Sequence, residues 1–158
     1  ILPQIIDLYE LFRFSARHEL AKTVSKFNSC NSVHQDKLAN GLIMSIGASP
    51  SVKSYFAASH KDEFAEKPSY VQDAEYTTAS VTPLSKISFA GVPVSKFQAI
   101  TCSEGACGVV IYSLRFDGLK PADKAALKAA VSKSPKSTKR PEFFSKNNET
   151  YVHCSLGE

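Results

Sequence analysis

The chain has 158 residues, of which 43% are hydrophobic and 22% are charged, a composition typical of one soluble globular domain and unlike that of a disordered chain. No apolar run approaches the roughly 20 residues that a membrane-spanning helix needs. The net charge of +4 permits contact with a polyanion but excludes the strongly basic surface of a dedicated nucleic-acid-binding domain.

Residues 1–27 predict a long amphipathic helix. Apolar residues recur every three or four positions and form one stripe: Ile5, Tyr9, Phe12, Ala16, Leu20, Val24 and Phe27. Acidic residues fall early on the opposite side and basic residues late, as the helix dipole favours. The part up to residue 14 is apolar on more than one side, so it is expected to pack against something outside its own domain. The expected assembly surface comprises Ile5, Ile6, Leu8 and Phe12.

Residues 28–74 are expected to be a connector of short helices and loops. Residues 28–32 are typical of a loop, and the apolar spacing over residues 35–46 predicts a short helix closed by Gly47. A third helical stretch begins at Ser49-Pro50 and runs through Val52, Tyr55 and Phe56. The polar residues that follow, including the acidic pair Asp62 and Glu63, are expected to be solvated.

Residues 75–158 predict an antiparallel sheet with one inserted helix. Alternating polar and apolar residues indicate strands over 76–81, 86–89, 96–101 and 108–116, with 109–116 as the central strand of a meander. Pro121 opens an alanine-rich helix that reaches Val131, and a last strand covers 150–156. The predicted fold is one α+β domain, residues 1–158, in which a long N-terminal helix packs on an antiparallel sheet with additional short helices.

The four cysteines, Cys30, Cys102, Cys107 and Cys154, allow three full pairings. Because Cys102 and Cys107 bracket a short polar turn, we expect one disulfide between them and another between Cys30 and Cys154. The longer loop would stabilise the fold by about 4–5 kcal/mol and imply an oxidising compartment. Free buried thiols are one alternative. A metal site is another, because His34 follows Cys30 by four positions and His153 adjoins Cys154, although the spacing of Cys102 and Cys107 lies just outside the usual zinc pattern.

The sequence carries no common catalytic signature: G-x-S-x-G, H-E-x-x-H, the P-loop and G-x-G-x-x-G are all missing. The four histidines fall in separate predicted elements and are expected to be surface or capping residues. We therefore predict a protein that is not an enzyme and that needs no cofactor or metal. The triplet Asn148-Glu149-Thr150 matches the glycosylation acceptor pattern, which matters only in a secreted eukaryotic chain.

Residues 133–140, after the predicted helix, form a Ser/Lys/Pro stretch that is a possible anion-binding loop. Its four basic residues are Lys133, Lys136, Lys139 and Arg140. The alternative is an ordinary solvated surface loop. No aromatic residues are interleaved with these charges, so the stretch offers no stacking platform for a single-stranded nucleic acid.

Several segments resemble bacterial type IV pilins. Ile1-Leu2-Pro3-Gln4, the following tyrosine and residues 15–20 (Ser-Ala-Arg-His-Glu-Leu) are similar to the middle of that family's first helix. Residues 76–81 look like its first sheet strand, and Tyr151-Val152-His153-Cys154 looks like its terminal aromatic-x-x-Cys region. A helix between the central and last strands is more like the type IVb branch than the type IVa branch.

The resemblance implies an extracellular or cell-surface filament subunit whose partners are copies of itself or related subunits. A membrane contact would then be made only by a segment upstream of Ile1. Residues 5–14 would pack against neighbouring helices in the filament core, and the C-terminal disulfide loop would form an exposed binding surface. The alternatives are a secreted effector or toxin-like α/β domain that binds a host surface or polyanion, and a small enzyme with an unmarked site. A leader and apolar stretch continuous with Ile1 would favour the pilin; a signal-peptide cleavage site before Ile1 would exclude it.

Overall fold

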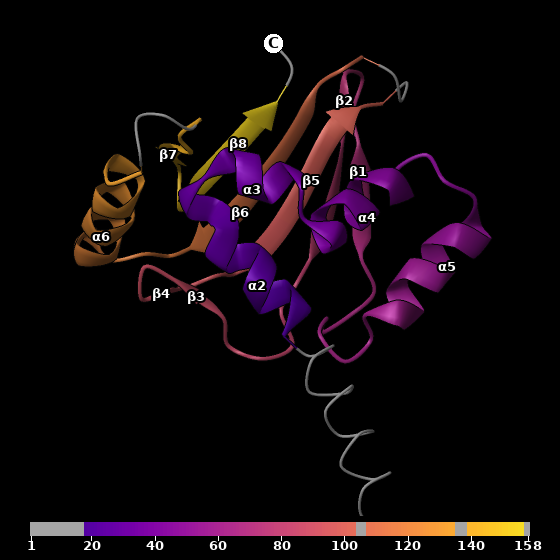
Figure 1. The fold of residues 1–158 in the computed structure, drawn as a ribbon, viewed down its shortest axis with the longest axis horizontal. Helices are drawn as coiled ribbons and strands as arrows, with labels where there is room; N and C mark the ends of the chain where they lie inside the picture. The colour runs from indigo at the N-terminus through magenta and orange to yellow at the C-terminus, as the bar shows by residue number, and fades with distance from the viewer. Residues whose placement is uncertain (1–17, 104–106, 135–138, 157–158) are drawn as a thin grey trace, which may run out of the picture.

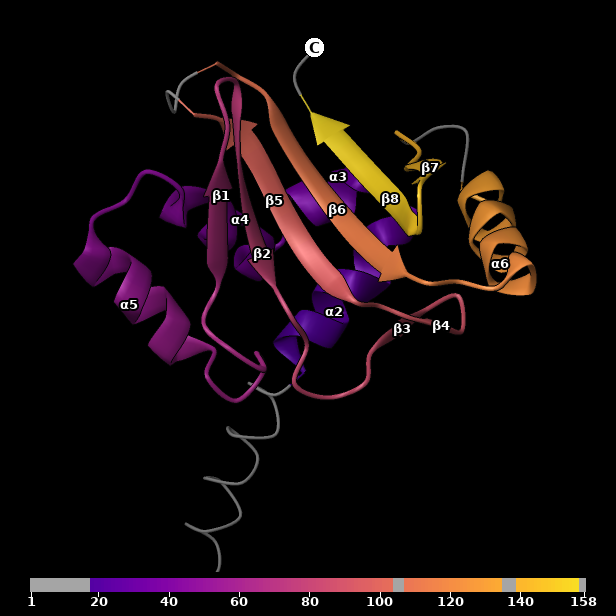
Figure 2. The ribbon, with the colours of Figure 1, turned by 180° about the vertical axis from the view of Figure 1, so that it is seen from behind.

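The computed structural model describes residues 18–103, 107–134 and 139–156. Short helices lie across one face of a twisted antiparallel sheet, and two further helices flank its sides (Figure 1). Seen from behind, the opposite face of the sheet is not covered by any helix of the described residues (Figure 2). The α+β class predicted from the sequence is therefore confirmed. The buried apolar residues of the described chain form one cluster between the helices and the sheet.

The helices are all short. They are α2 (Glu19–Ser25), the 3-10 helix η1 (Lys26–Asn28), α3 (Cys30–His34), α4 (Lys37–Ser45), α5 (Pro50–Ser59) and α6 (Pro121–Ser132). The described part of the long helix expected over residues 5–27 is thus only α2 and η1, and residues 5–17 lie outside the described residues. Helix geometry ends where Ser29 adopts an extended backbone, since serine and asparagine side chains compete with helical hydrogen bonds.

The loop expected over residues 28–32 is instead largely helical, because α3 begins at Cys30. This five-residue helix is held by burial of Cys30 and Val33 rather than by its own propensity. The next two helices were predicted, although α4 begins at Lys37 rather than at residue 35, whereas α5 begins at Pro50 as expected. The Asp36 side chain accepts a hydrogen bond from the Ala39 amide at 3.0 Å, and the Ser49 hydroxyl accepts one from the Val52 amide at 3.4 Å.

The main sheet has six strands in the spatial order β1-β2-β5-β6-β8-β7, and every neighbouring pair is antiparallel. The strands are β1 (Ser69–Gln72), β2 (Tyr76–Val81), β5 (Lys96–Cys102), β6 (Val110–Asp117), β7 (Glu142–Lys146) and β8 (Glu149–Leu156). The predicted central strand is indeed interior, as β6. A separate two-stranded hairpin consists of β3 (Ser88–Phe89) and β4 (Val92–Pro93).

Three details of the predicted sheet were wrong. The sheet begins at residue 69 rather than 75, because β1 adds an edge strand to what was expected to be a connector. The strand expected over 86–89 shrinks to two residues that pair with β4 outside the main sheet. A second edge strand, β7, follows α6. Both edge strands are mostly exposed, so they lack the buried alternation by which strands are recognised.

The core lies between the helical layer and the covered face of the sheet. Phe27 of η1 meets Phe97 of β5 edge-to-face at 6.0 Å, and Phe97 stacks against Tyr112 of β6 at 6.1 Å. The Tyr112 hydroxyl donates a hydrogen bond to the Asn40 side-chain oxygen at 2.7 Å. Burial, with a smaller contribution from the Asp36 carboxylate, raises the pKa of Tyr112 far above its ordinary value, so the phenol stays neutral.

Candidate functional site

The structure pairs all four cysteines as the sequence analysis expected, which leaves neither free thiols nor thiolate ligands for a metal. Cys30 of α3 is bonded to Cys154 of β8 across a sequence separation of 124 residues, with Cα atoms 5.1 Å apart. This bond joins the helical layer to a central part of the sheet. Two disulfides are compatible with an oxidising compartment.

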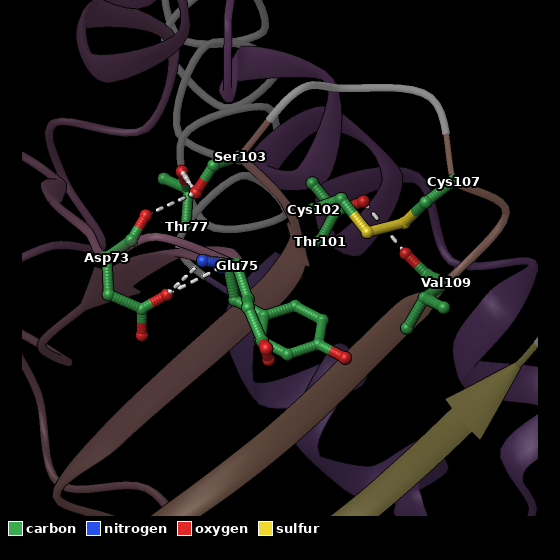
Figure 3. The surroundings of a disulfide bond; sticks show 9 residues. Asp73, Glu75, Thr77, Thr101, Cys102, Ser103, Cys107 and Val109 are labelled. Atoms are coloured by element: carbon green, nitrogen blue, oxygen red, sulfur yellow. Dashed lines mark hydrogen bonds between the residues drawn. A yellow bond between two sulfur atoms is a disulfide. The ribbon is translucent and has the colours of Figure 1, made fainter.

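The second disulfide, between Cys102 and Cys107, closes the end of the β5–β6 hairpin (Figure 3). Beside it, the Ser103 hydroxyl donates to the Asp73 carbonyl at 2.9 Å and its amide donates to the Glu75 carbonyl at 2.9 Å (Figure 3). The β1–β2 and β5–β6 turns are therefore tied together at one end of the sheet. Amide donation from Tyr76 and Glu75 lowers the pKa of the Asp73 carboxyl.

The predicted anion-binding loop is only partly visible. Lys133, Lys139 and Arg140 are exposed, whereas Lys136 lies outside the described residues. The Lys139 carbonyl accepts a hydrogen bond from the Cys30 amide at 3.1 Å, so the loop meets the helical layer at the long disulfide. The expected assembly-surface residues Ile5, Ile6, Leu8 and Phe12 also lie outside the described residues.

A groove of about 650 Å³ lies between α4 and α5. Its rims carry three exposed apolar side chains, Met44 (76% exposed), Val52 (50%) and Tyr55 (77%). Exposed apolar groups gathered around one groove are typical of an interaction surface, whereas single exposed apolar residues are common anywhere. This groove is the candidate functional site, and it is called the α4–α5 groove below.

The depth of the α4–α5 groove depends on Gly41. A Cβ atom at this position would lie 2.8 Å from the Phe56 ring, so only glycine lets α5 approach α4 this closely. Phe56 is the only residue of α5 that is buried, which leaves the rest of that helix turned outward. On the far side, the Tyr70 hydroxyl of β1 donates to Ser45 at 2.8 Å and the Lys53 amine lies 4.5 Å from the Tyr70 ring.

One end of the α4–α5 groove is charged. Glu19, the first residue of α2, lines the groove together with Lys37 and His60. The groove therefore begins where the chain enters the described body. The lining also includes the exposed apolar side chains of Met44 and Val52. An occupant with one apolar side and one charged end would complement this arrangement.

A second surface lies on the uncovered face of the sheet, where a cavity of about 400 Å³ adjoins an aromatic cluster. Phe144 stacks on Tyr151 at 5.0 Å, and His153 packs edge-on against Phe144 at 4.5 Å. Burial lowers the pKa of His153 to about 4, so its ring is neutral at physiological pH. Burial and a hydrogen bond to the Glu149 carboxylate raise the pKa of Tyr151 to about 12.

The sequence analysis missed the α4–α5 groove. Val52, Tyr55 and Phe56 were interpreted as one apolar side of a helix, yet the structure buries Phe56 and exposes the other two. The weak segregation of polar and apolar residues in residues 50–59 was the available signal, since a helix that hides a full face shows a clearer stripe. Glu63, expected to be a solvated carboxylate, is instead buried, with its side chain 2% exposed.

Comparison with known proteins gives no match: no family model, no curated protein and no solved structure is significantly similar to this chain. Among the residues that the structure describes, no helix combines the length and apolar character that crossing a membrane requires.

Proposed function

We propose that this chain is a non-enzymatic subunit of an extracellular filament, similar to type IV pilins, and that it acts in assembly, adhesion or surface contact. The observation that carries the proposal is the α4–α5 groove, whose edge includes Glu19. In the sequence, residues 1–17 precede this point and contain apolar residues on more than one helical side. The proposal pairs the apolar residues of this segment with the exposed apolar side chains that line the groove.

The occupant proposed for the α4–α5 groove is the apolar segment of a second copy, residues 5–14. One copy's segment then contributes Ile5, Ile6, Leu8 and Phe12 to its neighbour, where Met44 and Tyr55 are exposed. Burying these groups between copies would supply the association energy, at about 25 cal/mol for each Å² of apolar surface removed from water.

Mixed-isotope crosslinking tests this assignment. A photo-crosslinking amino acid replaces Leu8, and unlabelled and ¹⁵N-labelled chains are mixed before irradiation. Mass spectrometry is expected to find peptides from the α4–α5 groove joined to the probe, with light and heavy copies combined. The substitution Tyr55→Asp places a charge on the groove rim and is expected to remove these crosslinks. A probe at the exposed Lys128 of α6 serves as the control.

Two results would contradict the proposal. Crosslinks confined to pairs of the same isotope would mean that the segment occupies its own groove. A protein that remains monomeric at every concentration, with no groove peptide joined to the probe, would remove the groove as a contact between copies. Electron microscopy of the intact subunit in its producing cell then tests whether the copies form filaments.

A second candidate function is a secreted effector or toxin-like domain that binds a host surface or polyanion. The exposure of Lys133, Lys139 and Arg140 near the long disulfide favours this candidate. Retention on immobilised heparin that is lost at moderate salt, and lost in a variant with all three residues changed to glutamine, would support it. Retention that the triple variant leaves unchanged would exclude these residues as the polyanion site.

A further inference from the structure

Three side chains from separate parts of the chain converge beside the α4–α5 groove. Glu19 begins α2, His60 immediately follows α5, and Glu63 lies in the turn after it. The His60 Nδ1 atom is 3.3 Å from Glu19 Oε2 and 3.1 Å from Glu63 Oε2. One potential ligand atom from each of the three residues lies within 4.8 Å of the other two. The fold thus brings together two carboxylates and one imidazole.

Among the described residues of this cluster, two carboxylates accompany one basic side chain. Glu63 is 2% exposed, and its second oxygen accepts a hydrogen bond from the Leu20 amide at 2.7 Å, which fixes the carboxylate in place. Its carboxylate forms an ion pair with His60. The same ring nitrogen also faces Glu19. Two carboxylates therefore share one imidazole, which carries at most one positive charge, and a buried carboxylate is costly unless it is neutralised.

The two nitrogen–oxygen distances of the cluster are compatible with a small divalent ion. Four-coordinate zinc, with bonds of about 2.0–2.1 Å, separates its ligand atoms by about 3.3–3.4 Å. The two nitrogen–oxygen distances at this cluster are 3.3 and 3.1 Å. We propose that Glu19, His60 and Glu63 bind a divalent transition-metal ion, with zinc as the best fit. This inference does not rest on the proposed filament function.

The ligand types select among metals. An imidazole nitrogen together with carboxylates is typical of zinc and its neighbours, whereas calcium and magnesium prefer sites made of oxygen atoms alone. Three protein ligands leave the fourth position of a tetrahedral ion open. Glu19 and His60 line the α4–α5 groove, so an occupant of the groove would lie beside the ion. The ion would also fasten the start of α2 to the end of α5.

Isothermal titration of the purified, metal-free chain with zinc chloride at neutral pH tests the site. Binding of one equivalent is expected, together with a higher melting temperature in the presence of zinc. Cobalt(II) added in place of zinc is expected to give the intense visible absorption of a four-coordinate ion, which a surface carboxylate would not produce. Zinc is expected to displace the cobalt and abolish that absorption.

Two variants assign the ligands. Glu19→Gln changes a partly exposed side chain and is expected to leave the fold intact, as judged by circular dichroism. It should weaken zinc binding by more than about tenfold, the smallest loss associated with removing even an outer-shell partner. His60→Gln should abolish the cobalt absorption. Glu66→Gln and His153→Gln are matched controls that should retain wild-type affinity, because neither residue belongs to the cluster.

The proposal is overturned if wild type shows no saturable zinc binding at millimolar zinc, since the cluster would then be an ion pair between imidazolium and carboxylates alone. It is equally overturned if Glu19→Gln binds zinc as tightly as wild type. If His60→Gln does not fold, the Glu19→Gln result and the cobalt spectrum of wild type still decide the question.

Discussion

At the scale of single residues, one buried carboxylate holds three parts of the helical layer together. Asp36 caps α4, accepts a 2.6 Å hydrogen bond from the Thr23 hydroxyl of α2, and forms a 2.8 Å ion pair with Lys26 of η1. The first of these roles is local, although the sequence analysis placed Asp36 inside a helix over residues 35–46 rather than just before one. The other two depend on how α2 and α4 pack.

Two substitutions of Asp36 separate the contribution of its hydrogen bonds from that of its ion pair with Lys26. Asp36→Ala leaves a helix start uncapped and a buried hydroxyl unpaired, so the free energy of unfolding is expected to fall by about 2–4 kcal/mol. Asp36→Asn keeps an acceptor for both donors and loses mainly the half-exposed ion pair, at about 1 kcal/mol or less. Urea unfolding measures both, with the exposed Asp62→Ala as control. Equal losses in the two variants would contradict this account.

His153 makes stability depend on pH. Its folded pKa of about 4 lies below the value of about 6.5 for an unfolded chain, so between these values the unfolded state binds more protons. Stability is therefore complete above about pH 6.5 and is lost as the pH falls toward 4, by about 1–3 kcal/mol for this group.

The check is urea unfolding at several pH values between 7 and 4.5 for wild type and His153→Gln. Between pH 7 and 4.5 the free energy of unfolding is expected to fall less for the variant than for wild type. This holds even if the two proteins differ in stability at neutral pH. A proton titration of the His153 ring observed by nuclear magnetic resonance gives the pKa directly. A midpoint near 6.5 would contradict the burial argument.

At the scale of elements, the contact between α4 and α5 depends on a missing side chain. Gly41→Ala would ordinarily stabilise a helix by about 0.5–1 kcal/mol. Here the new methyl group meets the Phe56 ring at 2.8 Å, so overpacking is expected to lower the free energy of unfolding by about 1–3 kcal/mol. Urea unfolding gives the value, with the exposed Lys37→Ala of the same helix as control. A net gain in stability would show that α5 moves away freely.

Prediction of the elements succeeded where burial imposed a pattern. The strand predicted over 76–81 matches β2 residue for residue, and the helix predicted over 121–131 differs from α6 by one residue. The edge strands β1 and β7 were missed because their side chains are mostly exposed and show no alternation. The short helix α3 was missed because tertiary burial of Cys30 and Val33 holds it, and five residues carry little periodicity.

At the scale of the whole molecule, the two disulfides should differ in their effect on stability. In the chain-entropy model the Cys30–Cys154 bond, with a sequence separation of 124, contributes about 4–5 kcal/mol, whereas the bond between Cys102 and Cys107 contributes about 2 kcal/mol. Paired cysteine-to-alanine variants, unfolded in urea, provide the measurement. A larger loss from removing the short bond would contradict the model.

The sequence by itself predicted the α+β class, the interior strand and the cysteine pairing, the last with free thiols and a metal site as alternatives. These follow from local rules: alternation marks buried strands, caps mark helix starts, and a short polar turn brings two strand ends within bonding distance. Each rule acts over a few residues, so one sequence is enough to apply it. The assembly surface predicted over residues 5–14 stays a prediction.

Only the tertiary structure decided which side chains lie close together in space. Glu19 lies more than forty positions from His60 and Glu63, and the groove beside them exists because Gly41 admits Phe56. Contacts between residues distant in sequence depend on how the helices pack against each other. That packing depends on the volumes of all the neighbouring side chains together. A pattern of polar and apolar residues shows which face is buried, but not what that face will meet.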